Sequence, residues 1–228
     1  MNSNKKTARI VGVLFISATV SAVLSGFLIG PILDGPDYLI AVSANEIQVL
    51  IAVLLELILA VSVVGIAVFL FPIFREQNEA LALGYVGLRI LEGIIIIVGA
   101  ISALLLLTLS QEHVAGASDA SNFQTSATLL IAERDWTFLL GPVIVFSLNS
   151  LILNYLLYQS RLVPRFISVW GLIGATLLLA AGLLGMFDIY NIDSTVFLAA
   201  PIGVNEMVLA VWLIVKGFNP SAIVSESA

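Results

Sequence analysis

Long apolar runs, separated by short polar or Pro/Gly-containing stretches, dominate the pattern of residues along this chain. Several runs exceed the roughly 20 residues that a helix needs to cross a hydrocarbon layer about 30 Å thick. They lack the alternation of apolar and polar residues that is typical of outer-membrane barrel strands. The pattern therefore predicts an all-α transmembrane bundle of six helices, near residues 10–31, 47–71, 81–109, 136–158, 165–187 and 196–216.

Composition supports a membrane protein, and we expect residues 1–228 to form a single integral membrane domain. Hydrophobic residues make up 60% of the chain and charged residues 11%, with a mean hydropathy of +1.12. A soluble globule could not cover its surface with so few polar side chains. The first apolar run lacks an A-x-A-like cleavage site, which favours a retained helix over a signal peptide.

Basic residues gather on one side of the predicted helices. The positive-inside rule places such loops in the cytoplasm, so we expect both termini on the cytoplasmic side of the cell membrane. The other side is acidic; we interpret it as a solvated face, with attraction of cations as the alternative. The residues on the predicted cytoplasmic side are Lys5, Lys6, Arg9, Arg75, Arg161, Arg165 and Lys216, and the other side has only Arg134.

The longest predicted connection, residues 110–135, lies on the acidic side. It is long enough to hold a small external helix around 125–132, and we interpret it as a linker, with a lid as the alternative. Small residues at four-residue spacing predict close helix packing in a membrane. The first helix has Ala18, Ala22, Gly26 and Gly30 on one face, and the fifth has Gly171, Gly174, Gly182 and Gly185.

Four ionisable residues lie well inside the predicted spans: Glu56, Arg89, Glu92 and Glu206. At 1.5 Å per residue they lie about 12–16 Å from one end of their helices, at the same depth as Asn149. An isolated charge at mid-membrane costs about 2.5–3.5 kcal/mol, so these charges must be compensated.

Pairing supplies the compensation. Residues three apart share one face of a helix, so Arg89 and Glu92 are expected to point together into the bundle and to pair. Arg89 has further donors for Glu56 or Glu206. The sequence thus predicts one mid-membrane polar centre built by Arg89, Glu92 and Glu206, with Glu56 and Asn149 in support.

Three carboxylates facing one guanidinium favour a proton held or shared by at least one glutamate. Intramembrane ionisable groups are candidates for function, which indicates transport, sensing or binding of a proton, cation or small polar ligand. The first alternative is a non-catalytic structural or partner subunit whose buried charges only fix helix packing. The second is an intramembrane enzyme that uses paired carboxylates on a lipid.

Several chemistries have no support in the sequence. The chain has no cysteine and one histidine, His113, so neither a zinc site nor a disulfide is predicted. No nucleotide-binding loop is present, and a formal charge of −6 argues against nucleic acid as a partner. No catalytic or metal-binding residue and no particular cofactor or oligomer is indicated. The expected partners are the lipid bilayer and a small ligand or ion.

Four stretches carry a family pattern: ARIVGVLFI (8–16), LRILEG (88–93), YLLYQSRLVPRFISVWGLIGA (155–175) and PIGVNEMVLAVWLIVKGFNP (201–220). Together they resemble the bacterial multi-pass membrane family catalogued as domain of unknown function 4386. The S-R-L-x-P-R turn and the E-x-x-L-A-x-W-L-I-x-K-G helix are the most specific parts. The resemblance covers nearly the whole chain and implies a six-helix protein of the cytoplasmic membrane, with no activity assigned. It matches Arg89, Glu92 and Glu206 to polar positions of the family.

Overall fold

In a computed structural model, residues 3–116, 120–187 and 195–220 are described, and every regular element among them is helical. Six helical spans are long and apolar enough to cross a membrane, which confirms the predicted all-α six-helix bundle. The elements are α1 (Ser3–Leu33), α2 (Tyr38–Ala44), α3 (Glu46–Phe74), α4 (Glu79–Val114), α5 (Ala120–Phe138), the π-helix η1 (Leu139–Val145), α6 (Phe146–Ser160), α7 (Arg165–Met186) and α8 (Thr195–Val215).

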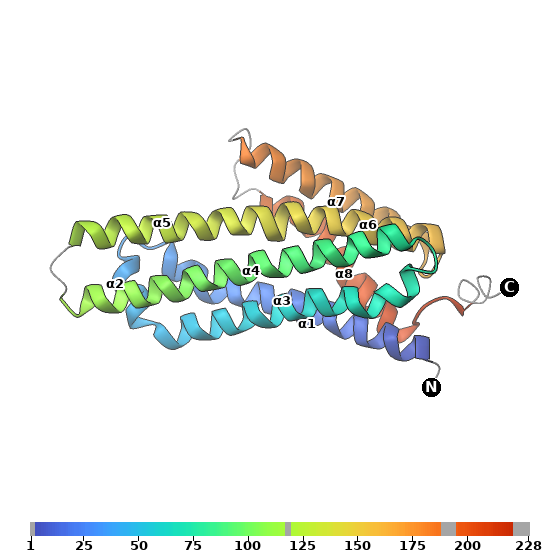
Figure 1. Cartoon of the computed structure of the whole chain (residues 1–228), viewed down its shortest axis with the longest axis horizontal. Helices are drawn as coiled ribbons and strands as arrows, with labels where there is room; N and C mark the ends of the chain where they lie inside the picture. Colours follow the sequence, from blue (N-terminus) through green and yellow to red (C-terminus); the bar gives the residue numbers. More distant parts are fainter. Residues whose placement is uncertain (1–2, 117–119, 188–194, 221–228) are drawn as a thin grey trace.

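The six spans pack as a closed ring in chain order. Each span contacts the next one along the chain, and α8 returns to pack against α1. Gly217, just after α8, lies beside Lys5 and Ala8 of α1, so the two termini emerge at one end of the bundle (Figure 1). We call this the terminal end and the opposite one the distal end. A ring of this kind directs one face of every span towards a shared centre.

The fourth span differs from its prediction. Helix α5 begins at Ala120 and continues through η1 into α6, so the predicted linker 110–135 and the helix start at 136 are both wrong. Apolar side chains explain the extension, because Ala127 of α5 and Leu106 of α4 belong to one buried cluster at the distal end. At 36 residues, or about 54 Å, α4 is longer than a 30 Å hydrocarbon layer is thick.

The π-helix has a local cause. Pro142 lies inside η1, where it has no backbone N–H to donate and its ring would clash with the carbonyl four residues earlier. A wider π turn accommodates this proline, and such turns are frequent at functional sites. Ser147 donates a 2.6 Å hydrogen bond to the Val143 carbonyl just beyond the proline. The same segment approaches α4 closely, since a Cβ added at Gly141 would lie 2.8 Å from Ile95.

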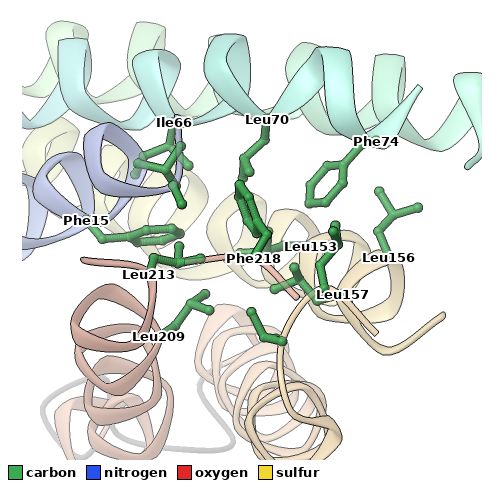
Figure 2. Packing of buried hydrophobic residues seen from close by; sticks show 14 of the residues in the cluster. Phe15, Ile66, Leu70, Phe74, Leu153, Leu156, Leu157, Leu209, Leu213 and Phe218 are labelled. Carbon is green, nitrogen blue, oxygen red and sulfur yellow. The ribbon is translucent and has the colours of Figure 1, made fainter. Parts of the chain in front are cut away.

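An apolar core fills the terminal end of the ring (Figure 2). Its side chains come from α1, α3, α4, α6, α7 and α8, from the turn between α6 and α7, and from Phe218 beyond α8. The largest fully buried members labelled in the figure are Phe15, Ile66, Leu70, Phe74, Leu153, Leu156 and Leu157. This core closes the terminal end beneath the buried charges of α4.

The glycines of α7 pack as predicted, whereas the predicted small-residue face of α1 packs only at Ala18, which belongs to a buried cluster with Ala60 and Val63 of α3. A Cβ added at Gly174 would lie 3.1 Å from the Ile202 backbone of α8. At Gly26 and Gly30 of α1 an added Cβ would meet nothing within 4 Å, so the expectation of tight packing there is wrong. Ser21 and Ser25, on the adjoining stripe of α1, are buried instead, and Ser25 donates a hydrogen bond to Glu56 of α3.

Candidate functional site

Arg89 and Glu92 of α4 lie side by side in the interior of the ring. The Arg89 Nη1 donates to the Glu92 carboxylate at 3.1 and 3.4 Å, and only 1% and 3% of the two side chains are exposed. The spacing of three residues places both on the same face of α4, as the sequence predicts. Burial of one without the other would leave an uncompensated charge in a low-dielectric interior.

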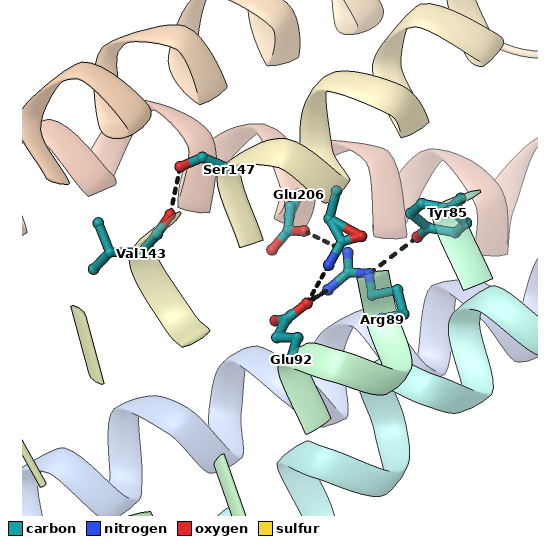
Figure 3. Close-up of polar contacts among 7 residues, drawn as sticks. Tyr85, Arg89, Glu92, Val143, Ser147 and Glu206 are labelled. Carbon is teal, nitrogen blue, oxygen red and sulfur yellow. Dashed lines mark hydrogen bonds and ion pairs between the residues drawn. The ribbon is translucent and has the colours of Figure 1, made fainter. Parts of the chain in front are cut away.

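Two further spans bring polar groups to this pair. Asn149 of α6 donates its Nδ2 to Oε2 of Glu92, and Glu206 of α8 places its Oε1 3.6 Å from Nη2 of Arg89 (Figure 3). Four of the five predicted site residues therefore meet in one place. We call these four residues, Arg89, Glu92, Asn149 and Glu206, together with the neighbouring Tyr85 of α4, the central cluster.

Tyr85 is a member of the central cluster that the sequence analysis missed. Its hydroxyl accepts a 3.2 Å hydrogen bond from Nε of Arg89, and its ring lies 5.5 Å from the guanidinium carbon. The centre of the Phe146 ring of α6 lies 5.6 Å from the same guanidinium carbon. The signal was present, since Tyr85 is four residues before Arg89 and so shares its helix face. Both rings thus lie within range of a cation–π contact with the guanidinium.

Glu56 does not join the central cluster. It forms an ion pair with Arg134 of α5 and accepts a 2.9 Å hydrogen bond from the Ser25 hydroxyl of α1. Arg134 also donates to the Gly99 carbonyl at 2.9 Å. We call Glu56 and Arg134 the distal ion pair. Gly99 is ten residues beyond Arg89, so this pair lies about 15 Å farther along α4.

The sequence analysis placed Arg134 in an external loop, and that placement is wrong. Because α5 is helical from Ala120, Arg134 lies within a continuous span that packs against α4. Its guanidinium is thus carried to the level of Glu56 instead of into solvent. The charge of Glu56 is compensated locally, which explains why it needs no share of Arg89.

Two cavities adjoin these groups. The central cavity, about 190 Å³, reaches Arg89, Glu92 and Glu206 and is lined by residues from all six spans. The distal cavity, about 230 Å³, reaches both residues of the distal ion pair. The two cavities have four lining residues in common and therefore lie next to each other: Ala22, Leu59, Ile96 and Pro142.

Glu206 is the least constrained group of the central cluster. Glu92 accepts from both Arg89 and Asn149, whereas Oε1 of Glu206 is buried without a hydrogen-bond partner and only faces Arg89 at 3.6 Å. Nη2 of Arg89 and Oδ1 of Asn149 also lack hydrogen-bond partners. Buried polar atoms of this kind are normally satisfied by water or a bound ligand.

Six apolar spans arranged around buried charges define an all-α multi-pass membrane protein. The chain belongs to the family described as Domain of unknown function (DUF4386), whose profile matches residues 10–217 and confirms the resemblance seen in the sequence. No curated protein and no solved structure matches the chain. The family description names no activity.

Proposed function

We propose that the central cavity binds a proton or a small monovalent cation, with Glu206 as the acceptor. The observation that carries this proposal is the 190 Å³ cavity that reaches the carboxylate of Glu206, whose buried Oε1 accepts no hydrogen bond. Intramembrane carboxylates that face a cavity commonly mark ion and proton pathways. The protein would then serve in transport or sensing.

The two glutamates have different surroundings, which supports a division of roles. Glu92 is held by Arg89 and Asn149 and provides a fixed negative charge next to the guanidinium. Glu206 contacts the guanidinium only loosely and has 12% of its side chain exposed. Arg89 then positions Glu92 and faces Glu206, while Glu206 remains available to the cavity.

Charge balance points the same way. With both carboxylates ionised, the central cluster has two negative charges and one positive charge. A net charge buried in a low-dielectric interior is costly. A proton or monovalent cation at Glu206 would bring the cluster to neutrality, and a carboxylate is a suitable acceptor for either.

The distal cavity offers a route to the site. It shares part of its lining with the central cavity and contains the distal ion pair on the way to the distal end. The apolar core at the terminal end leaves no comparable approach from that side among the described residues. We propose that the ligand enters from the distal end.

The basic residues favour a cytoplasmic terminal end. Arg75, Arg161, Arg165 and Lys216 follow or precede spans at the end where both termini emerge. By the positive-inside rule this end faces the cytoplasm of the cell membrane. The ligand would accordingly arrive from outside the cell.

A structural role is the alternative, and one observation favours it. The guanidinium of Arg89 contacts Tyr85, Glu92 and Glu206 and so links α4 to α8 directly. In that case the central cluster fixes helix packing and binds nothing. The two functions differ in their response to ions.

Thermal unfolding of the purified protein in a neutral detergent separates them. Titrations with Na⁺, K⁺ and Li⁺, each repeated over a range of pH, should raise the unfolding midpoint of the wild type for at least one cation or for protons. Glu206→Gln should abolish that response, and Glu112→Gln, at an exposed position near the end of α4, should leave it unchanged. A response of equal size in the wild type and Glu206→Gln would exclude Glu206 as the acceptor.

A further inference from the structure

A second polar site lies at the terminal end, away from the central cluster. A pocket of about 500 Å³ lies between the α6–α7 turn and the end of α8. Its lining includes Arg161, Arg165 and Lys216 together with the indole of Trp212. Three cations thus share one pocket at the level where a span leaves the membrane.

The positive charge of this pocket is not neutralised within the described part of the chain. Among the described residues, no ion pair includes Arg161, Arg165 or Lys216. All three cations are exposed at the surface. Such a pocket attracts an anion, and the positive end of the α7 dipole lies at Arg165 as well.

Local structure holds the cations in position. The guanidinium carbon of Arg165 lies 4.9 Å from the centre of the Tyr158 ring, a stacked arrangement that restricts the side chain. Arg161 adopts a left-handed backbone conformation with φ 57°. The turn is bound to the chain after α8, because the Asn219 backbone N–H donates a 2.9 Å hydrogen bond to the Leu162 carbonyl. The pocket is therefore formed before any ligand binds.

An apolar surface runs from the pocket along α7. Val169 and Ile173, four and eight residues after Arg165, lie on the same helix face and are 40% and 56% exposed. Leu172, Ile173, Thr176 and Leu177 line a shallow depression farther along this face. A free inorganic anion would not contact this apolar surface, whereas the acyl chain of a lipid would cover it.

We propose that this pocket binds the phosphate headgroup of an anionic phospholipid, with an acyl chain lying along α7. Arg161, Arg165 and Lys216 contact the phosphate, and Trp212 lies at the headgroup level, where aromatic residues are favoured. Basic pockets between helices are a recurring mode of anionic lipid recognition. The site is independent of ion binding at Glu206.

Native mass spectrometry of the full chain, released from a neutral detergent, tests the proposal. Phosphatidylglycerol and phosphatidylcholine of identical acyl chains are compared with inorganic phosphate at the same concentrations. We expect phosphatidylglycerol to bind at least tenfold more tightly than either of the other two. Arg161→Gln, Arg165→Gln and Lys216→Gln should each weaken its binding about fivefold, since one basic residue contributes about that factor.

Arg75→Gln is the matched control, because Arg75 is an exposed cation at the same end of the bundle and does not line the pocket. It should bind phosphatidylglycerol as the wild type does. Equal binding of phosphatidylglycerol and phosphatidylcholine would overturn the proposal, as would an equal loss in Arg75→Gln. Phosphate binding as tight as that of phosphatidylglycerol would assign the pocket to a free anion instead.

Discussion

Arg89 on α4 and Glu206 on α8 face each other at 3.6 Å, although 117 positions of the chain separate them. Glu92 holds the same guanidinium at 3.1 Å from within α4. One cation therefore serves two carboxylates, the nearer of which is fully engaged. The closer contact of Glu92 with Arg89 is the reason why we propose a structural role for Glu92 and ligand binding for Glu206.

Removal of the guanidinium should destabilise the bundle strongly. Arg89→Met leaves Glu92 buried without its cation, and breaking a buried ion pair from one side costs about 3–5 kcal/mol. Unfolding of the purified protein in mixed micelles measures this loss. The triple variant Arg89→Met/Glu92→Gln/Glu206→Gln should recover a large part of it, because neither carboxylate is then left without its cation. A triple variant as unstable as Arg89→Met alone would show that the charge is not the cause.

Glycine substitutions test which small-residue face carries the packing. Gly174→Val should lower the free energy of unfolding by about 1–3 kcal/mol, since its side chain would collide with the α8 backbone at Ile202. Gly26→Val is the matched control on α1, where an added Cβ meets nothing. It should cost much less, and the comparison uses the same unfolding assay. A larger loss at Gly26 would mean that the small residues of α1 do pack against another helix.

The distal ion pair should show a measurable coupling energy. A double-mutant cycle with Glu56→Gln and Arg134→Gln isolates the interaction of the two side chains, and contacting pairs typically give about 0.5–3 kcal/mol. Ser25→Ala, which removes one hydrogen bond to Glu56, should have a smaller effect of about 1 kcal/mol. Additive effects of the two glutamine substitutions would show that Glu56 and Arg134 do not interact.

The apolar pattern was sufficient to predict six spans and the inward face of α4. A spacing of three residues and the cost of a buried charge required Arg89 and Glu92 to pair, and similar depth brought Asn149 and Glu206 to the same level. These inferences use only the helix period and the dielectric of the membrane interior. They hold for any arrangement in which α4, α6 and α8 meet.

The partner of Glu56 could not be predicted in this way. Its choice of Arg134 over Arg89 depends on α5 being helical from Ala120, and the polar composition of residues 110–135 resembles that of a linker. The sequence also did not show which face of α1 is buried, because small residues and serines form adjoining stripes on that helix. Ser25 donates a hydrogen bond to Glu56 of α3, and Ser17 accepts one from Ser62 of α3. These contacts, which only the three-dimensional structure reveals, decide between the stripes.

The most direct test of the central claim is carbodiimide labelling followed by peptide mass spectrometry. A hydrophobic carbodiimide reacts with protonated carboxyl groups that a membrane-facing cavity makes accessible, and a bound cation protects them. We predict that Glu206 is modified, that Glu92 is not, and that the cation which stabilises the wild type slows the reaction at Glu206. Equal modification of Glu92 and Glu206, or labelling of Glu206 that no cation affects at any pH, would contradict the assignment of Glu206 as the exchangeable acceptor.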